Sequence, residues 1–330
     1  MNERHEIVIV GAGVVGLATA AMLARSAVAE QLTIRVLDAQ PAPRFDTTEP
    51  MGLRVSAMSA GSIGLLDSVG VIDELFATRA CPYRDMRVWD AGGAADGQAA
   101  LHFSAAEFAL PQLGFIVEDA LLRYSLLRCL DATAVQLQFG TGIQAMSRTG
   151  GGRELTLDNG EQLRAALVIG ADGARSAVRE LAAIEVDGWQ YPQAALVTHA
   201  RSAQSHRYTA WQRFMTDGPL ALLPLADGRV SIVWSTRPEL AKHYAQASAD
   251  EVSRALTDAS DHVLGELQVA ADCASLPLRA QHARNYVQQG IALVGDAAHT
   301  VHPLAGQGAN LGLADAAALA KVLEDSLNEG

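Results

Sequence analysis

The stretch 290–315, GIALVGDAAHTVHPLAGQGANLGLAD, combines residues that can bind a flat ligand with many hydroxyl groups. Its apolar start is typical of a buried strand, and Gly295-Asp296 puts a carboxylate at the end of that strand, where α/β sheets bind ligands. This carboxylate can accept hydrogen bonds from a polyol chain, and the glycines that follow let a planar ring approach the backbone. The helix predicted after the loop would begin with free N–H groups, which favour negative charge. A polyol chain joined to a planar ring that becomes anionic describes a reduced flavin.

The loop before this helix is the predicted catalytic element. A proline would give the loop a rigid shape, and glycines would lie against the ring. His299 and His302 flank the loop and could act as acid or base, but a structural role suits both equally. We predict a flavin-ring loop formed by Pro303, Gly306, Gln307 and Gly308, and cofactor contacts from Gly295, Asp296, Gly308, Ala309 and Asn310. The alternative is a glycine-rich turn that only starts a core helix.

A dinucleotide fingerprint opens the chain. The β-branched run 6–10 leads into GAGVVG and then into a helical pattern. Gly11 would make the tight turn, Gly13 would let a pyrophosphate approach, and Gly16 would let helix and strand pack. Asp38 ends the next predicted strand, 22 residues past Gly16, which is the spacing of an acid that binds ribose. The pattern predicts dinucleotide binding, and the alternative is a ligand-free strand–helix crossover of the same kind.

Two further segments carry candidate cofactor contacts. Asn159-Gly160 between apolar runs predicts a hairpin whose second strand delivers GADG at 170–173. Asp172 and Gly173 are predicted to contact the cofactor, although Asp172 could instead cap the next helix. Arg54 is predicted to steady the flavin or its phosphates, with a solvated surface arginine as the alternative.

Together these motifs resemble the FAD-dependent ubiquinone-biosynthesis hydroxylases, a branch of the flavoprotein aromatic monooxygenases that includes para-hydroxybenzoate hydroxylase. The resemblance rests on HPLAGQG at 302–308 with NLG at 310–312, on GADG, and on WQRF at 211–214 with GPLALLPL at 218–225. It covers nearly the whole chain. One departure is the family's Glu-Asn-Arg helix start, which is Glu118-Asp119-Ala120 here. Arg123 is the nearest arginine, and we include it among the predicted cofactor-binding residues, with a solvated helix charge as the alternative.

The resemblance implies an enzyme with FAD as cofactor and with NADPH or NADH and O2 as co-substrates. It implies hydroxylation of the aromatic ring of a polyprenylated phenol in ubiquinone biosynthesis, through a C4a-hydroperoxyflavin. Two alternatives stay open: hydroxylation of another aromatic substrate, and a catalytically silent flavin-binding subunit of a biosynthetic complex. A flavin halogenase is disfavoured because no tryptophan pair forms a Trp-x-Trp motif. A disulfide reductase is disfavoured because no redox Cys pair or second nucleotide motif is present.

The pattern of elements predicts an α/β fold, with a Rossmann-like FAD-binding domain and an inserted antiparallel β-sheet substrate domain. At 330 residues the chain is long enough for two domains. We predict a discontinuous FAD-binding domain over 1–80, 112–180 and 281–330, and a substrate-binding domain over 81–111 and 181–280. The family resemblance further implies that a carboxyl-terminal segment is missing or shortened.

Composition excludes several other classes of function. The formal charge of −12, without clustered Lys and Arg, argues against a nucleic-acid groove or a polybasic membrane patch. Three widely spaced cysteines form no disulfide framework and no metal-binding pair, so no metal site is predicted. The apolar stretch 7–24 contains the glycine motif and lacks the order of a signal peptide. We therefore expect a cytoplasmic protein, and the resemblance is compatible with peripheral contact to the inner membrane, a biosynthetic complex or a homo-oligomer.

Overall fold

A six-stranded sheet lies at the centre of the molecule in the computed structural model, which describes residues 4–302 and 306–329. Its strand order is β19-β20-β12-β1-β2-β8. Neighbouring strands pair in parallel from β20 to β8, whereas β19 is antiparallel to β20. The bounds are β1 (His5–Val10), β2 (Leu32–Asp38), β8 (Gln136–Phe139), β12 (Leu167–Gly170), β19 (Val287–Gln288) and β20 (Ile291–Leu293). The predicted first two strands and the strand at 291 are therefore confirmed.

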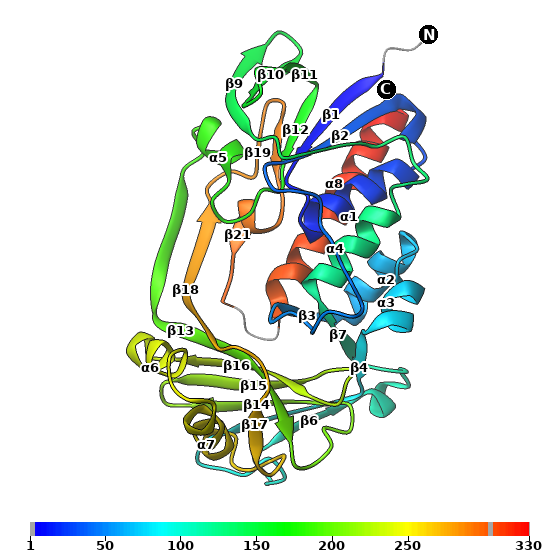
Figure 1. Ribbon diagram of the computed structural model, residues 1–330. Coiled ribbons are helices and arrows are strands. Elements are labelled where there is room, and N and C mark those ends of the chain that lie inside the picture. Colours follow the sequence, from blue (N-terminus) through cyan, green and yellow to red (C-terminus); the bar gives the residue numbers. More distant parts are fainter. Residues whose placement is uncertain (1–3, 303–305, 330) are drawn as a thin grey trace.

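Helices cover one face of this sheet, and a small sheet with one short helix covers the other (Figure 1). The predicted hairpin is confirmed. It joins β10 (Gly152–Leu157) to β11 (Gln162–Ala165), and Gly160 lies in its turn. The expected second hairpin strand is instead two strands, because the chain leaves the small sheet after β11 and joins the central sheet as β12. The helical face has α1 (Val14–Arg25), α2 (Ala60–Ser68), α3 (Ile72–Thr78), α4 (Asp119–Arg128) and α8 (Gln307–Glu329), and the other face has α5 (Ala177–Leu181), β9 (Ile143–Thr149), β10 (Gly152–Leu157) and β11 (Gln162–Ala165).

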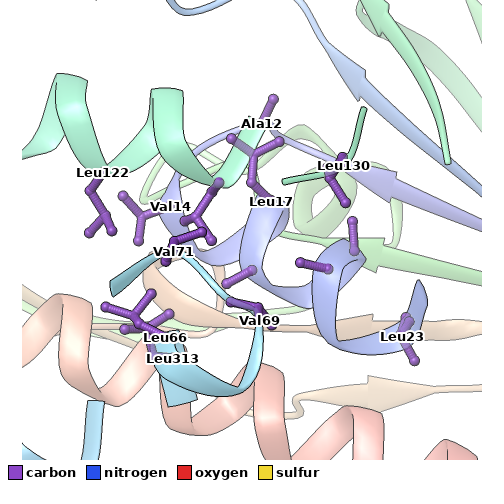
Figure 2. Packing of buried hydrophobic residues seen from close by; sticks show 14 of the residues in the cluster. Ala12, Val14, Leu17, Leu23, Leu66, Val69, Val71, Leu122, Leu130 and Leu313 are labelled. Atoms are coloured by element: carbon purple, nitrogen blue, oxygen red, sulfur yellow. The ribbon is translucent and has the colours of Figure 1, made fainter. Parts of the chain in front are cut away.

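The helical layer is held by a core of aliphatic side chains from four helices. Leu17 of α1, Leu66 of α2, Leu122 of α4 and Leu313 of α8 are all fully buried and belong to one cluster (Figure 2). Burying each such side chain stabilises the fold by roughly 1.5–3 kcal/mol. This packing fixes where α1 and α8 begin, and both begin at the same end of the central sheet.

A second large sheet lies below the central one in Figure 1 and forms a cap. Its strands are antiparallel, as predicted, except that β5 and β14 pair in parallel because β5 arrives from a separate excursion of the chain. The cap sheet contains β5 (Asp85–Asp90), β6 (Leu101–Ser104), β13 (Val186–Ser202), β14 (Thr209–Met215), β15 (Gly218–Pro224), β16 (Val230–Thr236), β17 (Leu267–Val269), β18 (Ala274–Ala283) and β21 (His299–Thr300). The last strand comes from a range that we assigned to the FAD-binding domain. The predicted domain boundaries stay a prediction.

The two faces of the cap sheet have different partners. Leu222 and Ile232 lie on one face and pack under α6 (Pro238–Tyr244) and α7 (Ala249–Ala259), which the sequence patterns did not predict. Residues one position along, such as Ala221, Leu223 and Val233, point to the opposite face because side chains alternate along a strand. That face is turned toward the central domain (Figure 1).

A fourth sheet, with three strands, joins the two halves of the molecule. It has the order β3-β7-β4, with β3 (Val55–Ser59), β4 (Cys81–Tyr83) and β7 (Gly114–Glu118). Ser59 caps α2 by accepting a hydrogen bond from the Ser62 N–H. Within the described ranges, no helix is both long enough and apolar enough to cross a membrane.

The side chain of Asn310 fastens the start of α8 to β3 and α2. Its Oδ1 accepts hydrogen bonds from the Ser59 N–H and the Ser62 hydroxyl, at 2.8 and 2.6 Å. Its Nδ2 donates to the carbonyl oxygens of Ala57 and Gly306, at 2.8 and 2.9 Å. The side chain is 9% exposed, so all four bonds are largely shielded from water.

We expect Asn310→Ala to destabilise the protein by about 3 kcal/mol, because buried partners lose their hydrogen bonds and a cavity remains. Chemical denaturation of the purified variant measures this change. Asn328→Ala, at an exposed position of the same helix, is the control and should change stability little. Equal stability of the two variants would contradict the fastening role of Asn310.

Candidate functional site

Four neighbouring parallel strands end at one edge of the central sheet, and each is followed by a predicted motif. The GAGVVG loop follows β1, Asp38 ends β2, GADG ends β12 and Gly295-Asp296 follows β20. Because the strands run in the order β20-β12-β1-β2, motifs far apart in sequence become neighbours in space. A cavity of about 720 Å³ lies at this edge, within the size range of ligand-binding sites.

Most of the predicted site residues line this cavity. They come from all four strand ends, from the loop before α8, and from β3 and α4. The lining includes Gly11, Gly13, Asp38, Arg54, Arg123, Asp172, Gly173, Asp296, Gly306, Gly308 and Ala309. Pro303 lies outside the described residues.

Four predicted residues lie beside the cavity without lining it, each for a physical reason. A Cβ on Gly16 would collide with the carbonyl oxygen of Gly11, so Gly16 serves the packing of α1. Gly295 has a φ of +58° and packs against the Val15 side chain. Gln307 is exposed on the first turn of α8, and the Asn310 amide is occupied by its four hydrogen bonds. The cofactor contact predicted for Asn310 stays a prediction.

The start of α1 forms an anion-binding corner of the cavity. A Cβ on Gly13 would meet no atom within 4 Å, and the first turn of α1 carries no acidic residue and no side-chain cap. Free N–H groups at such a helix start bind phosphates. Arg123 lies at the same corner, where its Nε donates to the Ala12 carbonyl oxygen at 3.3 Å. Arg123 is half-buried and lines the cavity, and its contact with a cofactor stays a prediction.

Asp38 is held in a fixed orientation. Its Oδ2 accepts a hydrogen bond from the Ala12 N–H at 2.7 Å, and its Oδ1 accepts one from the Gln40 N–H at 2.8 Å. Each carboxylate oxygen has a second lone pair, so Asp38 can still accept hydrogen bonds from the hydroxyl groups of a ribose.

Two further carboxylates in the cavity have raised pKa values. Burial raises the pKa of Asp172, although a hydrogen bond from the Val178 N–H to Oδ2 opposes the shift. Its Oδ1 is buried and has no hydrogen-bond partner among residues 4–302 and 306–329. The Asp172 carboxylate thus binds the first turn of α5, whose N-cap is Ser176, and keeps one buried oxygen without a described partner. Burial among protein groups also raises the pKa of Asp296, against the lowering effect of Arg54, although its side chain is open to the cavity. Raised pKa values of this kind mark functional sites.

Arg54, directly before β3, also lines the cavity. Its Nε is 3.4 Å from the Asp119 carboxylate, and its side chain is 81% exposed. An exposed ion pair of this kind adds little to stability. The position of Arg54 is therefore better explained by the cavity that it lines than by its pairing with Asp119.

Asp315 is a site-forming residue that sequence reasoning missed. Its Oδ2 accepts hydrogen bonds from the Gly295 N–H at 2.9 Å and from the His299 Nε2 at 2.6 Å. Asp315 thereby connects α8 to the turn that carries Asp296. The available signal was a lone carboxylate in an otherwise apolar helical stretch. His299 is its structural partner, and the hydrogen bond to Asp315 raises the pKa of His299.

A second, smaller pocket of about 50 Å³ lies between the large cavity and the cap sheet. Gly306 lines both spaces. The other lining residues come from β3, β4, β7 and the cap sheet, mostly from the face of that sheet that is turned away from α6 and α7, and include Tyr83, Met86, Gln212 and Leu223. Sequence patterns indicated alternation along these strands but not which alternate set faced a pocket.

Comparison with protein families matches residues 4–330 to the FAD binding domain. The chain is 40% identical over 331 residues to the 3-demethoxyubiquinol 3-hydroxylase of Escherichia coli (strain K12), covering 100% of this chain and 82% of that protein. It is 36% identical over 319 residues to the ubiquinone hydroxylase UbiL of Rhodospirillum rubrum, covering 96% of this chain and 72% of that protein.

Among solved structures, Pseudomonas aeruginosa PqsL in complex with 2-aminobenzoylacetate is similar with a TM-score of 0.82 and 24% identity. The match covers 99% of this chain and 88% of that one. Identity at this level shows the fold alone, and it confirms the predicted fold class.

The His299–Asp315 pair predicts a pH dependence of stability. Because the folded-state pKa of His299 is raised, its stabilising effect is complete below about pH 6.5 and is lost as pH rises through the folded-state pKa. We expect the free energy of unfolding to contain a contribution that falls as the pH rises above about 6.5 and through the raised folded-state pKa of His299, and His299→Gln to remove that contribution. Denaturant unfolding at several pH values measures it. His243→Gln, in an exposed pair with Glu251, is the control. A slope unchanged by His299→Gln would contradict the assignment.

Proposed function

The chain belongs to the FAD binding domain family and, within it, to the ubiquinone-biosynthesis hydroxylases, and from this membership we propose that it hydroxylates the aromatic ring of a prenylated phenol. FAD is the cofactor, and NADPH or NADH and O2 are the co-substrates. The relatives named above are hydroxylases of ubiquinol-type rings, which supports a polyprenylated phenol as the substrate.

The observation that carries the proposal concerns glycines that line the large cavity. The space that a side chain would fill there is open to a ligand and is not occupied by other parts of the protein. A Cβ on Gly13 or on Gly173 would meet no atom within 4 Å, yet both residues line the large cavity. By contrast, a Cβ on Gly11 or Gly16 would collide with backbone. Gly173 has a φ of +79°, which favours glycine by itself, whereas Gly13 has a φ of −74° that any residue can adopt. A bound group that approaches the backbone closely explains the glycine at position 13, and a nucleotide pyrophosphate is such a group.

The cavity offers suitable partners for each part of FAD. The free N–H groups at the start of α1, together with Arg123, suit the pyrophosphate, and Asp38 suits the adenosine ribose. Asp296 can accept hydrogen bonds from the ribityl chain. Gly308 lies opposite Asp296, because a Cβ there would be 3.9 Å from the Asp296 Oδ1.

The loop before α8 would lie against the flavin ring. Gly306 has a φ of +65°, and a Cβ there would press on Ala57 at 3.0 Å, so a side chain is excluded on this turn. The N-terminal N–H groups of α8 follow directly, and no acidic residue lies in its first turn. This helix start favours negative charge on the neighbouring ring.

Bound FAD supplies the redox chemistry, by accepting a hydride from NAD(P)H and then activating O2. The chain orients the aromatic substrate and excludes water from it. The small pocket suits this task, since most of its lining is apolar and it meets the flavin loop at Gly306. A cytoplasmic location, contact with a membrane, a biosynthetic complex and a homo-oligomer stay predictions.

We expect the FAD-loaded protein to oxidise NADPH or NADH under air and to convert a phenol with a short prenyl chain into a product heavier by one oxygen atom. Mass spectrometry of the product and the absorbance of the reduced nicotinamide measure this. Anaerobic incubation is the control and should give no such product. Nicotinamide oxidation that leaves the phenol unchanged would favour a different substrate or a silent flavin subunit.

Gly13→Val and Gly16→Val should fail in different ways. Gly13→Val should fold but purify without flavin, because its side chain fills space reserved for the pyrophosphate. Gly16→Val should destabilise the protein itself by several kcal/mol, because α1 can no longer approach Gly11. The visible spectrum and the thermal unfolding of each variant separate the two effects. Full flavin content in Gly13→Val would contradict the assignment of this corner.

A further inference from the structure

The small pocket between the flavin loop and the cap sheet has a composition that points to its ligand. Most side chains that line it are apolar, and Met86, Ile116, Leu223 and Val233 are the larger non-aromatic ones. None of the described lining residues carries a charge. An apolar space of this kind favours a neutral ring and disfavours an aromatic carboxylate, which would lose its hydration without gaining a cation.

Two polar side chains interrupt the apolar lining, from opposite walls. Gln212 lies on β14 of the cap sheet, and Tyr83 lies on β4 of the three-stranded sheet. Gln212 is only 6% exposed and lines the pocket. An amide in a largely apolar lining can donate one hydrogen bond to a ligand and accept another, so it favours a ligand with oxygen substituents over a purely apolar one.

The register of the cap sheet directs Gln212 into the pocket. Gln212 pairs across the sheet with Ala221, and Ala221 pairs in turn with Val233. All three line the pocket, so they share the face that is turned away from α7. The short side chain of Ala221 leaves space beside the Gln212 amide.

The Tyr83 ring can lie against the opposite wall because Gly114 has no side chain there. A Cβ on Gly114 would lie 2.6 Å from the Tyr83 hydroxyl oxygen, so the phenol ring lies across β7. Burial raises the pKa of Tyr83, and no hydrogen bond from a described residue opposes that shift. Tyr83 therefore carries its proton at neutral pH and can donate it to an acceptor.

We propose that Gln212 and Tyr83 are the specificity-determining residues that bind the oxygen substituents of a neutral aromatic substrate. This inference rests on the function proposed above and names the groups that recognise the ring. The Gln212 amide can donate to one oxygen and accept from a phenolic hydroxyl, and Tyr83 can donate to another oxygen. Each wall of the pocket thus holds one edge of the ring, beside the flavin loop at Gly306.

The ring enters only if a lining side chain moves. The pocket of about 50 Å³ is smaller than the roughly 150 Å³ that holds a benzene molecule in a protein interior. Met86 is the most adaptable lining residue, because its unbranched side chain has three rotatable bonds.

The test compares two ring probes, a methoxyphenol with a short prenyl chain and the prenylated benzene that lacks both oxygens. Dissociation constants for FAD-loaded protein are measured under anaerobic conditions from the flavin spectrum. We expect the wild-type protein to prefer the oxygenated probe by about 10-fold or more. Gln212→Leu and Tyr83→Phe should each lower this preference by about 3- to 10-fold, with normal flavin content. If Gln212 and Tyr83 had only a structural role, the two substitutions would weaken the binding of both probes equally and would leave the preference unchanged.

Gln190→Leu and Tyr208→Phe are the matched controls, since both positions are exposed and lie outside the pocket lining. They should leave the preference as in the wild type. If the wild type prefers the oxygenated probe and hydroxylates it, but both test variants keep that preference, the inference is overturned and the proposed function stands. If the wild type binds neither probe, both are overturned.

Discussion

The site depends on close contact between backbones at positions that have no side chain. α1 lies directly on the Gly11 turn because Gly16 lacks a Cβ, and α8 approaches the Gly295 turn because Gly312 lacks one. A Cβ on Gly312 would come within 3.2 Å of the Gly295 Cα. These contacts let two helices begin at the same edge of the central sheet. Both helix starts therefore present N–H groups to one cavity, where they stabilise negative charge together.

The carboxylates of the cavity belong to this arrangement. Asp172 and Asp296 have raised pKa values because protein surrounds them, which makes their ionised forms costly in the ligand-free protein. Residues that lower stability in this way are expected where a ligand must be bound. Asp38 and Asp315, by contrast, accept two hydrogen bonds each and hold backbone in place. Asp315 thus shapes a loop of the cavity, whereas Asp38 both holds backbone and keeps lone pairs for the proposed ribose contact.

The cap sheet performs two tasks because its side chains alternate. One face packs with α6 and α7 into a core of its own, which makes the cap rigid. The other face meets the flavin loop and β4, and it carries the short, apolar and amide side chains of the small pocket. A rigid sheet positions substrate-binding groups more accurately than a loop does. The parallel pairing of β5 and β14 completes this face with Met86.

The sequence by itself determined the local elements and the cofactor motifs. Glycine spacing, β-branched runs, the Asn159-Gly160 turn and the Ser59 cap depend on neighbours within a few residues, so they can be read along the chain. Only the tertiary structure decided that Asn310 fastens α8, that Asp315 holds the Asp296 turn, and that Arg123 reaches the α1 corner. It also decided that Gln212 and Tyr83 share a pocket, although 129 positions separate them in the chain. The physical reason is that a hydrogen bond or a pocket wall joins groups by distance in space, and folding brings those groups together from segments that carry no local sign of their partners.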